Sequence, residues 1–407
     1  MEFNPKQSTI MHIDLNSCFA TIEQQANRSL RGKPIAVVAY NSPGGCILAP
    51  SVEAKKLGIK TGMRVGEGKL LCPKLIILEP DPPKYRFVHL KLKEIVTRYT
   101  PNAHPKSIDE FVLDLEGCPA VRLGMHEVAQ KIKSDIKKEA GDFITVSIGI
   151  APNRFLAKLA SGLHKPDGLD EINKDNILEI YGRLALQDLS GIAQNNAVRL
   201  ASAGIYTVCD FYCADVATLK RAFRSIGGYY WYLRLRGWEI DGVEFSRKSF
   251  GNSYALPRPL AKSDELSPIL AKLTEKMCFR LRTAGFKARG VGLFINYQNG
   301  NFWHKTRLMA DFMYESGDFF KCAYKLLCDS PYKESVRVLA VSCFDLAKLS
   351  VIQPDMFGMQ AKKYNLANSV DAINAKWGSF VLGPASLLLS KENVKDRIAF
   401  GGVRDLI

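Results

Sequence analysis

Three acidic residues at two distant places, Asp14 and the adjacent pair Asp109 and Glu110, could do chemistry together. Each place belongs to a short run of strand-forming residues, 9–14 in the first case and 107–115 in the second. If the two strands pair, three carboxylates meet at one spot, where they repel one another unless cations share the site. Oxygen ligands of this kind suit hard divalent cations, Mg²⁺ above all. In a chain this basic, such a cluster predicts phosphoryl transfer on a nucleic acid.

Neighbouring residues of a strand point to opposite faces, so Asp109 and Glu110 can both be ligands only at the start of a strand or in a hairpin turn. Two prolines just upstream allow such a bend. The alternative interpretation makes the pair a solvated turn and Asp14 the N-cap of a helix that begins at Asn16. That alternative is weakened because an uncompensated carboxylate beside a strongly apolar strand is costly.

Two divalent ions at this cluster, about 3.5–4 Å apart, would supply most of the chemistry. One lowers the pKa of an attacking hydroxyl, and the other neutralises charge on a triphosphate and on the leaving pyrophosphate. Positioning and electrostatics then dominate, so no nucleophilic side chain is required. The sequence contains no convincing catalytic triad that would argue for another mechanism.

Length and composition are those of an ordinary globular protein. The chain has 407 residues, enough for about two to four domains, and is 47% hydrophobic and 24% charged. No apolar run approaches the ~20 residues that cross a bilayer, and residues 1–6 lack the apolar stretch of a secretory signal. Ten scattered cysteines form no C-x-x-C pair and match no zinc spacing. We therefore expect reduced thiols and a cytoplasmic, nucleoid-associated protein.

The formal net charge of +15, with a pI near 9.3, indicates a polyanionic partner. Basic character alone is common among intracellular proteins, but here the charge is clustered. Six cations lie between 272 and 289 against one acid, Glu275: Lys272, Lys276, Arg280, Arg282, Lys287 and Arg289. A solvated helix face is the alternative, but this imbalance favours contact with phosphates.

Residues 8–166 alternate short strand and helix patterns, which predicts an α/β or α+β core. We expect strands at 8–14, 34–39 and 143–150, and helices at 16–28, 53–58, 88–96, 122–140 and 152–162. From 170 to 235 the pattern is helical. Apolar runs are scarce from 237 to 258, which predicts a linker into a last domain with strands near 291–297 and 336–344.

Several blocks resemble the signature blocks of Y-family translesion DNA polymerases of the DinB/UmuC type. They read IDLNSCFA at 13–20, SIDE at 107–110, SIGIAPNRFLAKLAS at 147–161 and KPDG at 165–168. Their order and spacing match from about residue 8 to beyond 340, and SIDE combined with the later KPDG is highly specific.

The resemblance implies an α+β multidomain fold, a right-hand polymerase built from consecutive parts. These would be a ferredoxin-like palm in 1–20 and 80–167, small fingers in 21–79, a helix-hairpin-helix thumb in 168–235, a linker in 236–245, an α/β little finger in 246–345, and a C-terminal extension in 346–407.

The resemblance also implies roles for single residues. Asp14, Asp109 and Glu110 would be the catalytic metal ligands, joined by the backbone carbonyl of Leu15, and would hold two Mg²⁺ ions, which Mn²⁺ can replace. Phe19 would be a steric gate under the incoming sugar, although its pattern alone favours a core aromatic.

Lys55 and Lys165 would contact the triphosphate, as cations on phosphate oxygens should. By itself, Lys165 before a proline marks only a helix exit. Many relatives carry a tyrosine at the position of Val52 and a hydroxyl at that of Ala49, so two hydrogen bonds to the triphosphate are missing here. The run 45–49 looks closer to the UmuC branch, which points to weaker nucleotide binding or dependence on a partner.

Two further segments resemble binding elements of the family. Gly191 and Ala193 stand in a stretch like a helix-hairpin-helix, which would present backbone N–H groups to a DNA phosphate. The usual second glycine is replaced by Ala193, and a plain helix pair is the alternative. Residues 353–357 resemble the peptide by which bacterial polymerases hold a sliding clamp, with Gln353, Asp355, Met356 and Phe357 as the contacts.

Together these features predict a monomeric, template-directed DNA polymerase that uses deoxynucleoside triphosphates and copies damaged primer–template DNA. Small residues at 44–49 predict loose closure over the nascent pair and therefore low fidelity. One alternative is a catalytically weak, polymerase-like adaptor for DNA or clamp. Another is a different two-metal palm enzyme such as a nucleotide cyclase, which leaves the thumb-like hairpin and the basic last domain without a purpose.

Overall fold

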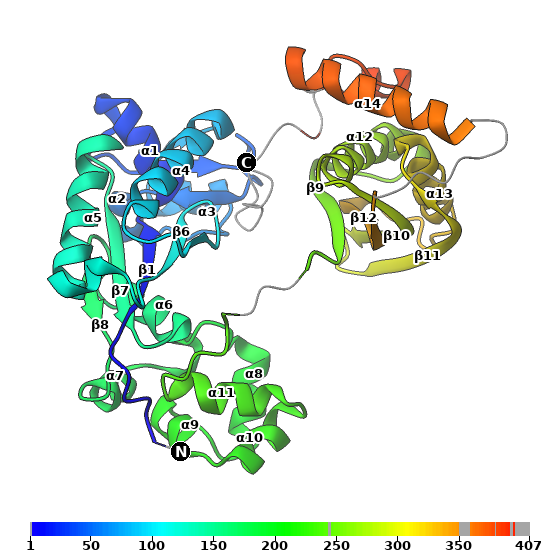
Figure 1. Ribbon diagram of the computed structural model, residues 1–407. Coiled ribbons are helices and arrows are strands. Elements are labelled where there is room, and N and C mark those ends of the chain that lie inside the picture. The colour runs from blue at the N-terminus through cyan, green and yellow to red at the C-terminus, as the bar shows by residue number, and fades with distance from the viewer. Residues whose placement is uncertain (1, 243–245, 350–358, 379, 391–393, 395–407) are drawn as a thin grey trace. The chain divides into compact units, whose positions relative to one another are not determined.

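The computed structural model describes residues 2–242, 246–349, 359–378, 380–390 and 394 (Figure 1). The described residues up to 242 form one compact unit, and those from 246 onward form a second. Within this part of the chain, no helix is both long enough and apolar enough to traverse a membrane. The mixed α+β, multidomain fold expected from the sequence is confirmed.

The first unit is built on a five-stranded sheet with the order β5-β6-β1-β7-β8. Its central strand β1 (Ile10–Leu15) runs antiparallel to both β6 (Glu110–Asp114) and β7 (Val146–Ala151). The outer strands are β5 (Ala103–Pro105) and β8 (Leu169–Glu171). The expected strands at 8–14 and 143–150 are therefore present, with ends shifted by a few residues.

Helices cover both faces of this sheet because its strands carry apolar side chains on both sides. On one face Met11, Ile13 and Leu15 pack in a core shared with α4 (Pro82–Thr97) and α5 (Met125–Glu139). On the other face, Ile10 and Val112 pack in a core shared with α6 (Arg154–Leu163). Strand alternation therefore directs Asp14 to the same side as α6.

Local capping explains where these helices begin. Asp81 caps α4 by accepting a hydrogen bond from the backbone of Lys84, and two prolines occupy the first turn. Asn153 caps α6 in the same way, accepting from the backbone N–H of Leu156 at 2.8 Å. The start of α6 is thus set one residue beyond the end of the SIGIAPN segment.

A small three-stranded sheet, ordered β3-β2-β4, lies between β1 and α4 in the chain. Its fully buried central strand β2 (Ile35–Val38) matches the strand expected at 34–39. The other elements of this region are β3 (Ile47–Pro50), β4 (Ile76–Leu78), α1 (Cys18–Ala26), η1 (Arg28–Leu30), α2 (Val52–Lys56) and α3 (Val65–Leu71). The helix expected at 16–28 is therefore α1 followed by the short turn η1.

The helical part of the first unit packs around aromatic side chains. Phe155 of α6 meets Trp231 edge-on at 5.3 Å between ring centroids, and Phe211 and Phe223 close the cluster. The helices are α7 (Ile177–Arg183), η3 (Leu186–Asp188), α8 (Gln194–Ala201), α9 (Val208–Cys213), α10 (Val216–Phe223) and α11 (Gly227–Leu235); η2 (Pro119–Leu123) lies earlier, before α5. This region is tied to the sheet through α6.

Part of the expected linker is packed against the first unit. The side chain of Asn4 donates to the carbonyl of Gly237 at 2.9 Å, and the indole of Trp238 donates to the carbonyl of Glu2 at 3.2 Å. Arg234 also forms an ion pair with Asp241. Residues 236–242 therefore behave as an ordered end of this unit.

The second unit is a four-stranded antiparallel sheet with the order β11-β10-β12-β9 and helices on one face (Figure 1). The strands are β9 (Ser249–Leu260), β10 (Phe286–Tyr297), β11 (Phe302–Met313) and β12 (Val336–Lys348), and the covering helices are α12 (Ser263–Thr283) and α13 (Ser316–Cys328). Two of these strands were expected, although each is longer than its apolar run.

The expectation of a linker at 237–258 was wrong for its second half, because β9 begins at Ser249. Phe250, Tyr254 and Leu256 are buried while the residues between them are wholly or partly exposed. This alternation is that of a strand with one covered face, and the polar outer residues hide it from a search for apolar runs.

Residues of the expected C-terminal extension pack on the second unit. Helix α14 (Met359–Trp377) is joined to α12 by a bidentate ion pair between Arg282 and Asp371, at 2.6 and 2.8 Å. The short helix η4 (Ala385–Ser390) also contacts α12.

Candidate active site

Asp14 and Glu110 lie directly opposite one another in the antiparallel pairing of β1 with β6. Opposed residues of paired strands project from the same face, so the two carboxylates point together. Ligand atoms of Asp14, Glu110 and His12 all lie within 4.8 Å of one another. The pairing inferred from the two short sequence runs therefore occurs, and it brings these two acids together.

Asp109 lies one residue before β6 begins, where the strict alternation of the strand does not apply. Its backbone carbonyl accepts a hydrogen bond from the N–H of Leu15 at 2.9 Å, which joins it to the end of β1. Its carboxylate accepts a hydrogen bond from the Ser107 hydroxyl. Burial raises the pKa of Asp109, and the charges of Asp14 and Glu110 raise it further. Asp109 is thus electrostatically part of the cluster.

Two lysines neutralise the paired carboxylates. The ammonium of Lys165 lies 2.7 Å from Asp14 Oδ2, and that of Lys158 lies 2.8 and 2.7 Å from the two oxygens of Glu110. Burial raises the pKa of Asp14 despite the opposing charge of Lys165. Burial also acts to raise the pKa of Glu110, but Lys158 and the His12 beside it lower it overall.

His12 was missed from the sequence. It is 2% exposed, its Nε2 lies 3.7 Å from Glu110 Oε2, and neither ring nitrogen has a hydrogen-bond partner. Burial lowers the pKa of His12 to about 4, so the ring is neutral at pH 7. One signal could have found it: His12 stands two residues before Asp14, the spacing that puts two strand residues on one face.

Asn16 holds the loop that carries Lys165. Its side-chain oxygen accepts a hydrogen bond from the backbone N–H of Asp167 at 2.8 Å, and its amide donates to Ser147 Oγ at 2.9 Å. The same Ser147 hydroxyl accepts from the N–H of Gly168 at 3.2 Å. The end of β1 therefore fixes the 165–168 loop beside Asp14.

The other predicted nucleotide contacts lie near this cluster. Burial lowers the pKa of Lys55, and so does the nearby Lys165, while Asp14 and Asp109 raise it. Ala49 is buried in β3, and Val52 is the first residue of α2. Neither side chain can donate a hydrogen bond, as expected from the sequence.

Phe19 is 1% exposed and belongs to the core that contains α4. Its ring stacks on that of Tyr85, with centroids 4.3 Å apart. Phe19 is therefore a core aromatic residue, as its sequence pattern alone had favoured.

The donor set fits a hard divalent cation. Asp14 and Glu110 meet where β1 pairs with β6, and Asp109 is close enough to interact with their charges, so the cluster offers oxygen ligands and excess negative charge, as Mg²⁺ requires. The buried His12 lacks a partner on either nitrogen, which leaves one polar group in the cluster unsatisfied. Asp14, Asp109 and Glu110 are therefore the residues that could hold such an ion.

The predicted hairpin is a turn between η3 and α8. Gly191 has a φ of +101°, which favours glycine, and Ala193 is the N-cap of α8. Alanine has no side chain to cap the helix, and no acid lies in its first turn. No side chain therefore caps the first N–H groups of this helix, which are placed to bind an anion, although the N–H of Asn196 already bonds the carbonyl of Ala193 at 3.0 Å.

The six cations at 272–289 are not arranged as a free basic face. Lys272 is buried, and the guanidinium of Arg282, 4% exposed, is paired with Asp371. The prediction that these two contact DNA was wrong, because the apolar face of α12 turns both inward. The other four also have partners within the unit: Val394 for Lys276, Gly251 and Asn252 for Arg280, the Phe312 ring for Lys287, and Asp345 for Arg289.

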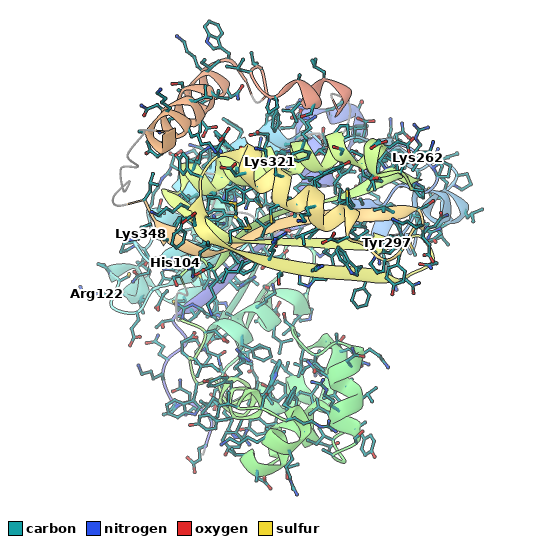
Figure 2. All side chains as sticks on the ribbon, turned by 90° about the vertical axis from the view of Figure 1, so that its right-hand side faces the viewer. His104, Arg122, Lys262, Tyr297, Lys321 and Lys348 are labelled. Atoms are coloured by element: carbon teal, nitrogen blue, oxygen red, sulfur yellow. The ribbon has the colours of Figure 1, made fainter. Side chains whose placement is uncertain are left out.

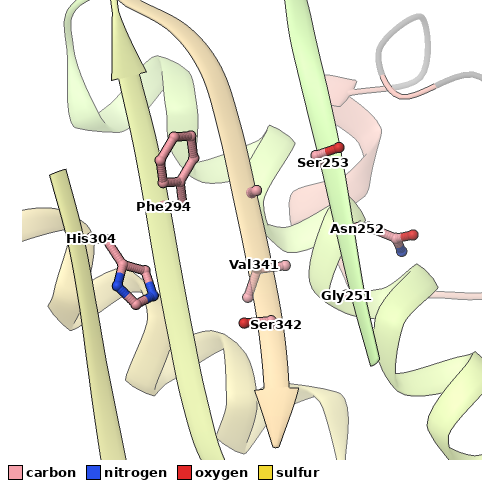
Figure 3. A pocket seen from close by; sticks show the side chains of 8 residues that line it. Gly251, Asn252, Ser253, Phe294, His304, Val341 and Ser342 are labelled. Carbon is pink, nitrogen blue, oxygen red and sulfur yellow. The ribbon is translucent and has the colours of Figure 1, made fainter. Parts of the chain in front are cut away.

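Exposed cations of the second unit lie elsewhere. Figure 2 labels Lys262 before α12, Lys321 on α13 and Lys348 at the end of β12, all of them exposed. The sheet face away from the helices carries small and polar residues around a shallow hollow (Figure 3). Its lining is Gly251, Asn252, Ser253, Phe294, His304, Ala340, Val341 and Ser342. Residues 353–357, the predicted clamp peptide, lie outside the described residues.

Comparison with known proteins gives matches over most of the chain. A family model described as the impB/mucB/samB family matches residues 13–162, and one for the C-terminal domain of that family matches 247–356. The chain is 31% identical over 377 residues to DNA polymerase IV of Pelotomaculum thermopropionicum, covering 91% of this chain and 92% of the relative. It is 31% identical over 401 residues to DNA polymerase IV of Bacillus anthracis, covering 96% of each. These relatives carry the polymerase IV name, whereas run 45–49 had pointed to the UmuC branch.

Solved structures share the fold. A Y-family DNA polymerase chimera superimposes with a TM-score of 0.73 at 23% identity, covering 83% of this chain and 99% of the chimera. An insertion ternary complex of Dbh DNA polymerase gives a TM-score of 0.57 at 23% identity, covering 82% and 98%.

Proposed function

This chain belongs to the impB/mucB/samB family of Y-family DNA polymerases, and we propose that it extends a primer by metal-assisted phosphoryl transfer at Asp14, Asp109 and Glu110. It is a DNA-directed DNA polymerase of the translesion class, dependent on a divalent metal and acting on DNA and deoxynucleoside triphosphates. The observation that carries the site assignment is the opposition of Asp14 and Glu110 across β1 and β6, with Asp109 at the start of β6.

The chain's own residues supply binding and orientation. Asp14, Asp109, Glu110 and the carbonyl of Leu15 would hold two Mg²⁺ ions. When bound, the ions would lower the pKa of the primer hydroxyl and neutralise charge on the triphosphate. Because Asp14 and Glu110 project from two hydrogen-bonded strands, the separation of their carboxylates is set by the sheet.

Lys165 and Lys55 bind the triphosphate in this proposal. Asn16 anchors the Lys165 loop, so that ammonium is held beside Asp14 before substrate arrives. Lys55 sits within the electrostatic reach of the same acids. Phe19 excludes a ribose 2′-hydroxyl through its fixed ring.

DNA binding divides between the two units. The open N–H groups at the start of α8, beside Gly191 and Ala193, bind a backbone phosphate. In the second unit the outer face of the sheet suits a sugar–phosphate backbone, because its small residues allow close approach and Ser253, His304 and Ser342 offer polar contacts. Contacts to the phosphate backbone at α8 and at this sheet face do not depend on base identity, as a polymerase requires.

We also propose that the chain is a monomeric catalytic subunit held to a sliding clamp through residues 353–357. In this proposal Met356 and Phe357 fill a hydrophobic pocket of the clamp, Gln353 fixes the end of the peptide by hydrogen bonding, and Asp355 is a further contact. Two observations weigh against the adaptor and cyclase alternatives. The three acids are all present, and the relatives, at about 30% identity over nearly their whole length, are named DNA polymerases.

Primer extension with the purified protein, with and without clamp and on damaged and undamaged templates, tests the proposal. Asp109→Ala should abolish incorporation while DNA affinity, measured by fluorescence anisotropy, stays nearly unchanged. Glu127→Ala, on the exposed first turn of α5, is the matched control and should extend normally. Incorporation by Asp109→Ala would show the ligand assignment to be wrong. No incorporation by the unaltered chain, alone or with clamp, would favour the adaptor.

A further inference from the structure

We propose that Lys158 serves as an exchangeable counter-ion: it neutralises Glu110 in the metal-free protein and must be displaced when a metal ion binds. This inference rests on the proposed metal site. Lys158 lies within the 147–161 block, but neither the resemblance nor the proposed reaction gives it a role.

The contact geometry is that of a cation occupying a ligand position. The ammonium of Lys158 touches both oxygens of Glu110, at 2.8 and 2.7 Å. A metal ion on the same carboxylate would need at least one of those oxygens. Lysine and metal therefore compete for Glu110.

The lysine comes from a rigid element and not from a loop. It lies on α6, whose N-cap Asn153 also binds the carbonyls of Arg234 and Trp238. Its side chain is 40% exposed, so the ammonium can swing into solvent without repacking the helix. Displacement thus costs little beyond the lost ion pair.

The cluster needs such a cation when no metal is present. Asp14, Asp109 and Glu110 repel one another, and two of them are paired in this structure with Lys165 and Lys158. A flexible ammonium can keep the acids assembled and then yield to a divalent ion with twice its charge.

Metal binding without DNA or nucleotide isolates this step from catalysis. Mn²⁺ alone, followed by electron paramagnetic resonance of the free ion, gives the dissociation constant of the full-length protein. Removing the competitor in Lys158→Met should tighten Mn²⁺ binding on the order of three- to tenfold, the range expected for one partly buried ion pair. In EDTA the same variant should melt at a lower temperature than the unaltered chain, and Mn²⁺ should raise its melting temperature more.

Lys106→Met is the matched control. Lys106 is exposed and close enough to influence His12 electrostatically, but its ammonium forms no ion pair with the Glu110 carboxylate. It should leave Mn²⁺ affinity nearly unchanged. If Lys106→Met and Lys158→Met tighten Mn²⁺ binding equally, the proposal is overturned, because the loss of any nearby positive charge would then explain the effect.

Two other outcomes also overturn it. Weaker Mn²⁺ binding by Lys158→Met, restored by Lys158→Arg, would mean that the lysine orients Glu110 for the metal. Unchanged affinity in Lys158→Met and in the milder Lys158→Gln would mean that it does not compete. If the unaltered chain binds no Mn²⁺, the metal site itself fails, and that result is separate from a failure of Lys158 alone.

Discussion

The ring of Phe19 lies flat on that of Tyr85, with centroids 4.3 Å apart and planes 12° from parallel. Tyr85 is fixed in turn, because its hydroxyl donates to Glu23 Oε1 at 2.9 Å while Lys84 donates to Glu23 Oε2 at 2.7 Å. A core role and a role in sugar selection are therefore compatible: the packing that buries Phe19 also makes its position rigid.

Phe19→Ala should admit ribonucleotides, because the side chain that excludes the 2′-hydroxyl is gone. The measurement is the ratio of kcat/KM for a deoxynucleotide to that for the matching ribonucleotide. The same change removes a buried ring and should cost about 3–5 kcal/mol of stability, so Phe19→Leu, which keeps more volume, is tested beside it. Unchanged sugar discrimination in folded protein would leave Phe19 with a structural role only.

Asp109→Asn should stabilise the metal-free protein at pH 7. Burial and the neighbouring acids raise the pKa of Asp109, so the folded state binds this proton more tightly than the unfolded chain does. Ionised Asp109 therefore destabilises the fold above that raised pKa, and asparagine removes the charge. As pH falls through the raised pKa, the unaltered chain becomes protonated and the difference shrinks.

Melting temperatures of Asp109→Asn and of the unaltered chain, measured in EDTA across pH 4–8, test whether the variant is the more stable of the two at pH 7. A variant that is less stable at pH 7, or a difference that does not change with pH, contradicts the electrostatic account of the cluster.

Gly149→Ala should destabilise the first unit, because α6 packs directly on β7 at this point. An added Cβ would lie 2.0 Å from the carbonyl oxygen of Ala157 and 2.2 Å from the nitrogen of Ser161. Pushing α6 away should cost at least about 1–3 kcal/mol, and it would also move Lys158 from Glu110.

Gly162→Ala is its control within the same helix. A Cβ there meets no atom within 4 Å, so the substitution should be neutral or stabilise by up to about 1 kcal/mol. Urea denaturation of both variants makes the comparison. Equal effects at the two positions would mean that close packing at Gly149 does not matter.

Asp371→Ala should strongly destabilise the second unit. It leaves the guanidinium of Arg282 buried without its carboxylate partner, a loss of about 3–5 kcal/mol for a broken buried pair. Asp318→Ala breaks the exposed pair with Lys363 and should cost about 1 kcal/mol or less. Thermal unfolding of the two variants distinguishes a docked α14 from a loosely attached one. A small effect of Asp371→Ala would indicate that α14 contributes little to this unit.

Local sequence pattern was sufficient to predict several parts of this protein. Strand-forming runs next to Asp14 and Glu110 predicted the strands β1 and β6, and two prolines upstream allowed the bend at which Asp109 precedes β6. Motif spacing indicated the polymerase family. These features follow from side-chain alternation and from residue order, which require no knowledge of distant packing.

Which side chains pair with those acids depends on long-range packing. Periodicity shows that α6 has an apolar face, but not that this face covers β1 so that Lys158 reaches Glu110. It likewise shows a basic run at 272–289, but not that α14 supplies Asp371 to a buried Arg282. The partner of a charged side chain is known only once its helix is packed, and packing is set by contacts between segments far apart in the chain.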